Sequence, residues 1–129
     1  MSASVNGFGE IAESLRRSTV LINAGGRGNG SGVIWSSEGV IITNAHVARR
    51  DRVKVEAWDG QTVDAIVEKR DTRRDLAMLR ARQVAPAAQP GDSNALRAGQ
   101  IVLAAELTQH GLEVGRAHDR AIMRLEDLA

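Results

Sequence analysis

The chain has 129 residues and a formal net charge of +1, with 43% hydrophobic and 26% charged residues. This composition is that of an ordinary globular protein of one domain's length, and its charge balance excludes strong attraction to nucleic acid or to an anionic membrane. The absence of cysteine excludes disulfides and thiolate metal sites, and the few aromatic residues (Phe8, Trp35 and Trp58) cannot form a base-stacking surface.

The N-terminus, Met-Ser-Ala-Ser-Val-Asn-Gly, lacks the basic start and the apolar core of a signal peptide. No apolar stretch approaches the roughly 20 residues that cross a bilayer. As written, the sequence therefore predicts a cytoplasmic chain without membrane contact. A periplasmic or secreted location is expected instead if an export segment was removed.

The first predicted element is a short amphipathic helix within residues 1–17, with Asn6 as a suitable N-cap. Its apolar positions recur at helical spacing: Phe8, Ile11, Ala12 and Leu15. Because the helix is short and carries few basic residues, we expect it to cover the following domain rather than to bind a membrane surface.

Short β-type segments follow the helix, separated by turn residues. The predicted strands are 18–23, 31–36, 40–43, 52–58, 61–69 and one that Asp75 opens. Asp59-Gly60 is the strongest hairpin signal and suits a two-residue turn with positive φ. Six strands with no long helix among them predict a mainly β fold, a small antiparallel barrel over residues 18–82.

Residues 24–30, Ala-Gly-Gly-Arg-Gly-Asn-Gly, are rich in glycine. A phosphate-binding loop has to join a strand to the N-terminus of a helix, whereas another strand is predicted to follow here. We therefore interpret this stretch as a hairpin loop and predict no bound cofactor.

Two polar residues stand at strand ends. His46 follows the apolar strand 40–43, so a rigid support would present its imidazole where the chain leaves the sheet. The alternative is a hydrogen-bonded core histidine, and this stretch alone does not separate the two. Asp75 opens another apolar strand, where its carboxylate would accept an N–H from one ring nitrogen of a histidine and leave the other nitrogen as a base.

Several motifs occur in a fixed order between about residues 5 and 105: Gly30-Ser31-Gly32-Val33-Ile34, residues 39–47, Asp59-Gly60, residues 75–79, Gly91-Asp92-Ser93 and residues 96–99. Together they resemble trypsin-like serine peptidases of the HtrA type. The resemblance implies a trypsin-like N-terminal barrel in which His46 is the general base and Asp75 is its orienting partner.

The resemblance also implies a nucleophile in a later Gly-x-Ser-Gly-Gly segment, whose backbone N–H groups help to form an oxyanion hole. The sequence contains no such segment. Ser31 lies in a Gly-Ser-Gly motif, but in the family that motif belongs to an early strand. We therefore expect no nucleophile among the serines of this chain: Ser2, Ser4, Ser14, Ser18, Ser31, Ser36, Ser37 and Ser93.

Residues 83–99 contain both prolines among alanines, glycines and polar residues, which is typical of a linker. In the family such a linker joins the first barrel to a second. Residues 100–129 are then expected to hold the first strand of a truncated second barrel, at about 100–105, and a helical tail from Ala117. The tail helix has two open interpretations, as a cover for exposed apolar surface or as a partner-binding element.

No metal site is predicted, because His110 and His118 lack acidic or cysteine neighbours at ligand spacing. Two functions remain. The first is the N-terminal half of an HtrA-like serine endopeptidase, which would cleave a peptide or unfolded protein once a second barrel completed it and would be inactive alone. The alternative is a non-catalytic interaction module or truncated remnant that forms a homo-oligomer, because a lone barrel would expose the face that meets its partner barrel.

Overall fold

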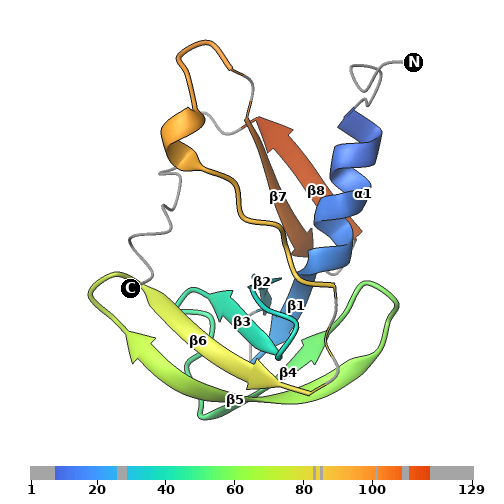
Figure 1. Ribbon diagram of the computed structural model, residues 1–129. Helices are drawn as coiled ribbons and strands as arrows, with labels where there is room; N and C mark the ends of the chain where they lie inside the picture. Colours follow the sequence, from blue (N-terminus) through green and yellow to red (C-terminus); the bar gives the residue numbers. More distant parts are fainter. Residues whose placement is uncertain are drawn as a thin grey trace.

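The computed structural model describes residues 8–25, 29–82, 84, 86–100, 102–108 and 111–116. Figure 1 shows a β-barrel in the lower part of the view, with one helix and a two-stranded sheet above it. In chain order the elements are α1 (Phe8–Ser18), β1 (Thr19–Asn23), β2 (Asn29–Ile34), β3 (Val40–Thr43), β4 (Arg52–Glu56), β5 (Thr62–Asp71), β6 (Leu76–Ala81), a short 3₁₀ helix (Ser93–Ala95), β7 (Leu103–Thr108) and β8 (Gly111–Arg116). The predicted tail helix from Ala117, the N-cap Asn6, and His110 and His118 lie outside the described residues.

The first six strands close into an antiparallel barrel in the order β1-β2-β3-β6-β5-β4. The pair β1 and β4 completes the closure, with Leu21 opposite Glu56 and Ile22 opposite Val55. This arrangement confirms the predicted mainly β fold with a six-stranded antiparallel barrel and a short N-terminal helix.

The turn at Asp59-Gly60 differs from the prediction. The chain does reverse here, but through residues 57–61 rather than through a two-residue turn. The amide of Gly60 donates to the carbonyl of Ala57 at 3.0 Å, and the amide of Ala57 donates to the carbonyl of Gln61 at 2.8 Å. Only the glycine of the pair has a positive φ, of 83°. This is the longer hairpin loop in which a left-handed glycine follows an ordinary turn, so one such residue suffices.

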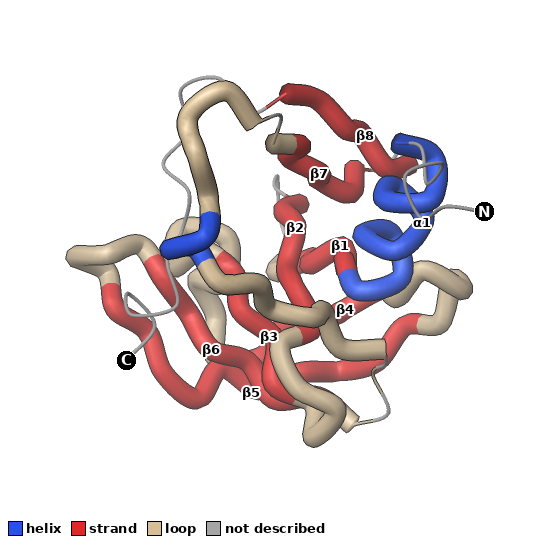
Figure 2. The backbone as a smooth tube through the Cα atoms, turned by 45° about the horizontal axis from the view of Figure 1, so that its top comes forward, coloured by secondary structure: helices blue, strands red, loops and turns tan. Residues whose placement is uncertain are grey.

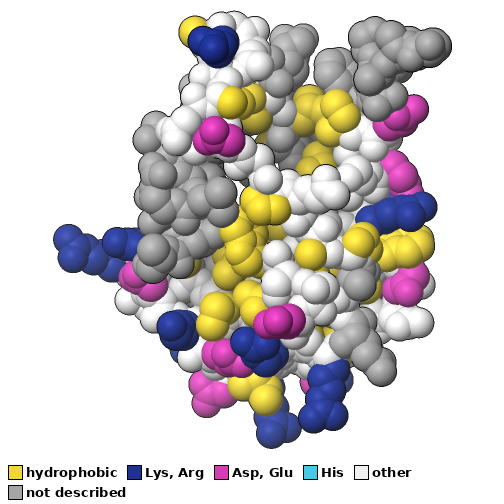
Figure 3. All heavy atoms as spheres, in the orientation of Figure 1, with side chains coloured by type: hydrophobic (Ala, Val, Ile, Leu, Met, Phe, Trp, Pro, Cys, Tyr) yellow, Lys and Arg dark blue, Asp and Glu magenta, His cyan; other side chains and the backbone are white. Residues whose placement is uncertain are grey.

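The barrel core consists of β-branched and aliphatic side chains that alternate along the strands. The largest fully buried side chains are Val20, Ile22, Ile34, Ile41, Val55 and Leu79. Burial of each side chain of this kind stabilises the fold by roughly 1.5–3 kcal/mol. Figure 3 shows apolar side chains toward the middle of one face and lysine and arginine side chains around its lower margin.

A second sheet, formed by β7 and β8, lies beside the barrel. Its two strands pair antiparallel, with Leu103 opposite Arg116 and Thr108 opposite Gly111. Figure 2 shows this sheet next to α1, and β7 contacts β1, β2 and α1. The sequence predicted a strand at about residues 100–105, and the structure places it at 103–108; β8 was not predicted.

Ser31 of β2 links the barrel to this second sheet. Its hydroxyl donates to the carbonyl oxygen of Leu107 at 3.0 Å and accepts from the amide of the same residue at 2.7 Å. One side chain thus satisfies both backbone groups of a residue on β7. The Ser31 hydroxyl therefore has a structural contact between the barrel and the second sheet.

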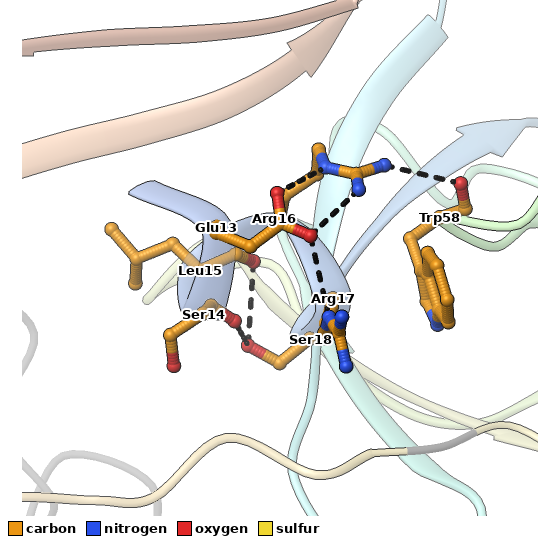
Figure 4. A network of polar contacts seen from close by, with 7 residues as sticks. All are labelled: Glu13, Ser14, Leu15, Arg16, Arg17, Ser18 and Trp58. Atoms are coloured by element: carbon orange, nitrogen blue, oxygen red, sulfur yellow. Dashed lines mark hydrogen bonds and ion pairs between the residues drawn. The ribbon is translucent and has the colours of Figure 1, made fainter. Parts of the chain in front are cut away.

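At the C-terminal end of helix α1, hydroxyl side chains donate hydrogen bonds to backbone carbonyl groups of its last turns. The Ser18 hydroxyl donates to the carbonyl of Ser14, and the Thr19 hydroxyl donates to that of Leu15. The helix also reaches the β4–β5 loop, because the guanidinium groups of Arg16 and Arg17 lie 5.5 and 5.0 Å from the ring centroid of Trp58 (Figure 4). In the described part of the chain, no helix is long and apolar enough to cross a membrane.

Candidate active site

The register of β3 and β6 brings the two predicted site residues to the same end of the barrel. In this antiparallel pair Thr43 lies opposite Ala77, so the residues that follow β3 meet the residue that precedes β6. His46 comes three residues after Thr43, and Asp75 directly precedes β6. Two strands of the closed barrel therefore fix both positions.

A single helical turn presents His46 to solvent. The carbonyl of Asn44 accepts the amides of Val47 at 3.1 Å and Ala48 at 3.2 Å. Ala45 and Ala48 are buried, at 5% and 0% exposure, and anchor the inner side of the turn. The His46 side chain lies on the outer side and is 62% exposed. It is not the buried core histidine that the sequence left open as an alternative.

Asp75 is held by a tight turn of its own. The Asp71 carboxylate accepts the backbone amides of Arg73 and Arg74, both at 3.1 Å, and so folds the chain back just ahead of Asp75. Asp75 has φ of 57°, in the left-handed region that residues other than glycine seldom adopt. Aspartate tolerates this region better than most residues do.

Both oxygens of the Asp75 carboxylate contact His46. Oδ1 accepts the backbone amide of His46 at 2.9 Å, and Oδ2 lies 2.6 Å from Nδ1 of the imidazole. Contacts to the backbone and to the ring of the same residue fix the ring's position and its orientation together. This is the geometry expected of a base and the group that orients it.

These contacts also define the proton positions. The backbone amide of His46, then its ring N–H, lower the pKa of Asp75 from the ordinary value for a carboxyl group, against a partial loss of solvation. Asp75 is therefore ionised at neutral pH and can only accept. Nδ1 of His46 must then donate, which leaves the lone pair of a neutral ring on Nε2.

Two arginines stabilise the carbonyl groups of the turn that carries His46. Arg49 Nε donates to the carbonyl of His46 at 2.9 Å. The guanidinium of Arg70 donates to the carbonyl of Ala48 at 3.0 and 2.6 Å through its Nε and Nη2. The sequence did not predict these contacts of Arg49 and Arg70.

Within the described residues, Nε2 of His46 has no hydrogen-bond partner, and no described serine hydroxyl is bonded to it. The Ser31 hydroxyl is bonded to Leu107 instead. In this described part of the chain, no group of three or more histidine or acidic side chains is arranged to share a metal ion. What this site offers chemically is therefore an oriented imidazole base.

Asn44 is a further site residue, which the sequence did not predict. Its side-chain Nδ2 donates to the backbone carbonyl of Asp75 at 2.9 Å, across 31 residues of sequence. No local sequence pattern predicts a contact between a side chain and a backbone group so far apart in the sequence. The available signal was its position, directly beyond a buried strand and two residues before His46.

Comparison with known proteins defines the class. Residues 30–126 match the model of the trypsin-like peptidase domain. The match covers more than half of the chain, and it includes the strands that carry His46 and Asp75. The chain belongs to the trypsin-like peptidase family.

Its relatives are serine proteases of the HtrA type. Over 79 residues the chain is 42% identical to serine protease HTRA1 of Xenopus laevis, covering 59% of this chain and 17% of the relative. Over 81 residues it is 44% identical to the Do-like HtrA of Lactobacillus helveticus, covering 58% of this chain and 20% of the relative. A third relative, mitochondrial HTRA2 of Bos taurus, is 40% identical over 79 residues, covering 59% of this chain and 17% of the relative. The chain is thus a trypsin-like domain of HtrA type, and it spans about a fifth or less of these relatives.

Proposed function

We propose that this chain supplies the general base and its orienting carboxylate to a serine endopeptidase. In this role Nε2 of His46 takes the proton of a serine hydroxyl as that oxygen attacks a peptide carbonyl. Asp75 holds the ring and stabilises the imidazolium that forms, and His46 then returns the proton to the leaving amine. The observation that carries the proposal is the double contact of Asp75 with the amide and the ring of His46.

The nucleophile and the oxyanion-hole donors belong, in this proposal, to a segment other than the described residues. In support of this division, the Ser31 hydroxyl is bonded to Leu107, and no described serine has a hydrogen bond to Nε2 of His46. Nucleophilic attack needs a hydroxyl within hydrogen-bond reach of the base, at about 2.6–3.2 Å. The 129-residue chain by itself is therefore proposed to be inactive, with a peptide or an unfolded polypeptide as the substrate of the completed enzyme.

A segment exchange tests the proposal. The matched segment of this chain replaces the corresponding 81-residue segment in the Lactobacillus helveticus protease, its relative at 44% identity. The chimera is expected to hydrolyse an unfolded protein substrate, and His46→Ala in it is expected to lower kcat by roughly four orders of magnitude or more. A folded chimera in which His46→Ala leaves kcat unchanged would refute the role of His46.

The isolated chain is the negative control for this experiment. Incubated with a fluorophosphonate that labels activated serines, it is expected to remain unlabelled, while the chimera is labelled. Stoichiometric labelling of the isolated chain would show that one of its own serines is activated, and would overturn the proposed division of the catalytic residues.

A further inference from the structure

Asn44 contacts both the turn that carries His46 and the backbone of Asp75. Through its backbone carbonyl it accepts the amides of Val47 and Ala48, which closes the turn that carries His46. Through its side-chain Nδ2 it donates to the backbone carbonyl of Asp75 at 2.9 Å. One residue thus joins the loop of the base to the loop of its orienting carboxylate.

The bond from Asn44 reaches Asp75, the residue of the site with an unfavourable backbone conformation. Asp75 has φ of 57°, although an aspartate in isolation favours negative φ. The carboxylate of Asp75 reaches both the amide and the ring of His46 from this backbone conformation. A backbone that relaxed to an extended conformation would turn the side chain away from at least one of these groups. Strain of this kind persists only where the surroundings hold it in place.

An amide side chain suits the position chemically. The group to be held is a carbonyl oxygen, which needs a donor, and the Asn44 amide supplies an N–H at hydrogen-bond distance. An aspartate of the same shape would present only acceptors at neutral pH and would repel the carbonyl. The bond is therefore specific to the amide and does not follow from the shape of the side chain alone.

We infer that Asn44 is a positioning residue: by holding the main chain of Asp75 in its left-handed conformation, it keeps both carboxylate oxygens on His46. The inference rests on the proposed function, in which those two contacts orient the base. Asn44 itself touches neither the ring nor the reacting atoms, and its effect passes through Asp75.

Nuclear magnetic resonance of the isolated chain tests this without any need for turnover. In wild-type protein the proton on Nδ1 of His46 is expected as a far-downfield signal, and the backbone amide of His46 exchanges slowly with solvent. In Asn44→Ala the downfield signal is expected to weaken or vanish. Exchange of the His46 amide is expected to accelerate by roughly fivefold, the effect of one solvent-exposed hydrogen bond. The pKa of Asp75, followed by its carboxyl carbon shift, is expected to rise toward its ordinary value.

Two further variants separate positioning from a general loss of stability. Asn44→Asp keeps the shape but loses the N–H donor, so it is expected to behave like Asn44→Ala. Thr43→Val removes a comparable bond one residue away, because the Thr43 hydroxyl donates to the carbonyl of Ser31 at 2.7 Å. It is expected to lower overall stability while leaving the downfield signal, the exchange of the His46 amide and the Asp75 titration as in wild type.

The result that supports the inference is a change in the three His46 and Asp75 readouts in both Asn44 variants but not in Thr43→Val. Wild-type readouts in either Asn44 variant would overturn it, as would equal changes in Thr43→Val. Because the readouts do not depend on peptide cleavage, they report on Asn44 whether or not the chimera proves to be a peptidase.

Discussion

Gly39 lies directly against the backbone of Ala81. Its carbonyl accepts the amide of Ala81 at 2.9 Å, its φ is 96°, and a Cβ added at Gly39 would overlap the carbonyl oxygen of Ala81. Gly39 precedes β3 and Ala81 ends β6, so the contact fixes one end of the strand pair whose other end carries His46 and Asp75. A position far from the site thus helps to set the register on which the site depends.

Gly39→Ala is expected to lower the free energy of unfolding by about 3 kcal/mol or more, because it combines backbone strain with a steric clash that only backbone movement relieves. Denaturant unfolding followed by tryptophan fluorescence measures the effect. Gly60→Ala is the matched control: Gly60 also has a positive φ, of 83°, but an added Cβ meets nothing within 4 Å. Gly60→Ala is expected to lower the free energy of unfolding by about 1 kcal/mol, because alanine disfavours the positive φ. Equal losses in the two variants would show that the contact with Ala81 has no effect.

Asp75→Asn is expected to make the stability of the chain less dependent on acid pH. The contacts to His46 lower the pKa of Asp75 in the folded state, so its stabilising contribution is complete above the pKa of the unfolded chain, about 3.9, and disappears as pH falls through the lower folded value. Asparagine also tolerates a positive φ, so the backbone of the variant is not strained further.

The difference in unfolding free energy between wild type and Asp75→Asn should therefore be largest above about pH 5 and shrink below about pH 4. Urea unfolding between pH 7 and pH 2.5 measures it, and the comparison cancels other groups such as Glu13, whose pKa its bond to Arg16 also lowers. A difference that stays constant over this range would mean that the Asp75 contacts do not favour its ionised form.

Ser31→Ala is expected to loosen the second sheet from the barrel. It leaves the amide and the carbonyl of Leu107 without their side-chain partner, at a cost of about 1–2 kcal/mol for these partly buried groups. Hydrogen exchange at Leu107 should accelerate while exchange in the core strand β3 stays slow. Ser37→Ala, at an exposed turn position, is the control and should leave Leu107 unchanged. Slow exchange of Leu107 in Ser31→Ala would show that the sheet is held by other contacts.

Trp58→Leu is expected to weaken the contact of helix α1 with the β4–β5 loop, although the bond from Arg16 to the backbone carbonyl of residue 58 remains. The variant keeps an apolar side chain but removes the ring that lies near the guanidinium groups of Arg16 and Arg17 (Figure 4). Amide exchange within α1 should accelerate by roughly threefold, and by less at high salt, where charge interactions are already screened. Lys54→Ala, which removes an exposed ion pair to Asp64, should leave α1 unchanged. Equal effects of both substitutions would contradict a specific role for the ring.

The barrel follows from the sequence because its signals are local and repeated. Residues 40–43 form an apolar β-branched run that ends at a polar pair, and the structure gives β3 the same bounds. The ends of the other barrel strands differ from the expected bounds by at most two residues, because hydrogen bonding to neighbouring strands decides how far a strand continues. The pairing of His46 with Asp75 could be predicted from the sequence for the same reason, because each residue lies at a strand end.

The remaining features depend on contacts that no local pattern encodes. The sequence of β8, Gly-Leu-Glu-Val-Gly-Arg, carries two glycines and two charges in six residues, so its pairing with β7 outweighs a weak strand propensity. The positive φ of Asp75 arises from the preceding turn at Asp71, and its link to Asn44 crosses 31 residues. Such positions, where local preference and final structure disagree, are typical of functional sites.

The tautomer of His46 tests the central claim most directly, because the proposed chemistry requires a free lone pair on Nε2. Nitrogen-15 chemical shifts of the imidazole ring, recorded at a pH where the ring is neutral, distinguish a nitrogen that carries a proton from one that does not. With Asp75 accepting from the ring, Nδ1 is expected to be protonated and Nε2 to be bare, and Asp75→Asn should weaken this preference. A wild-type ring protonated mainly on Nε2 would contradict the account, since its base would then point at Asp75 and away from any substrate.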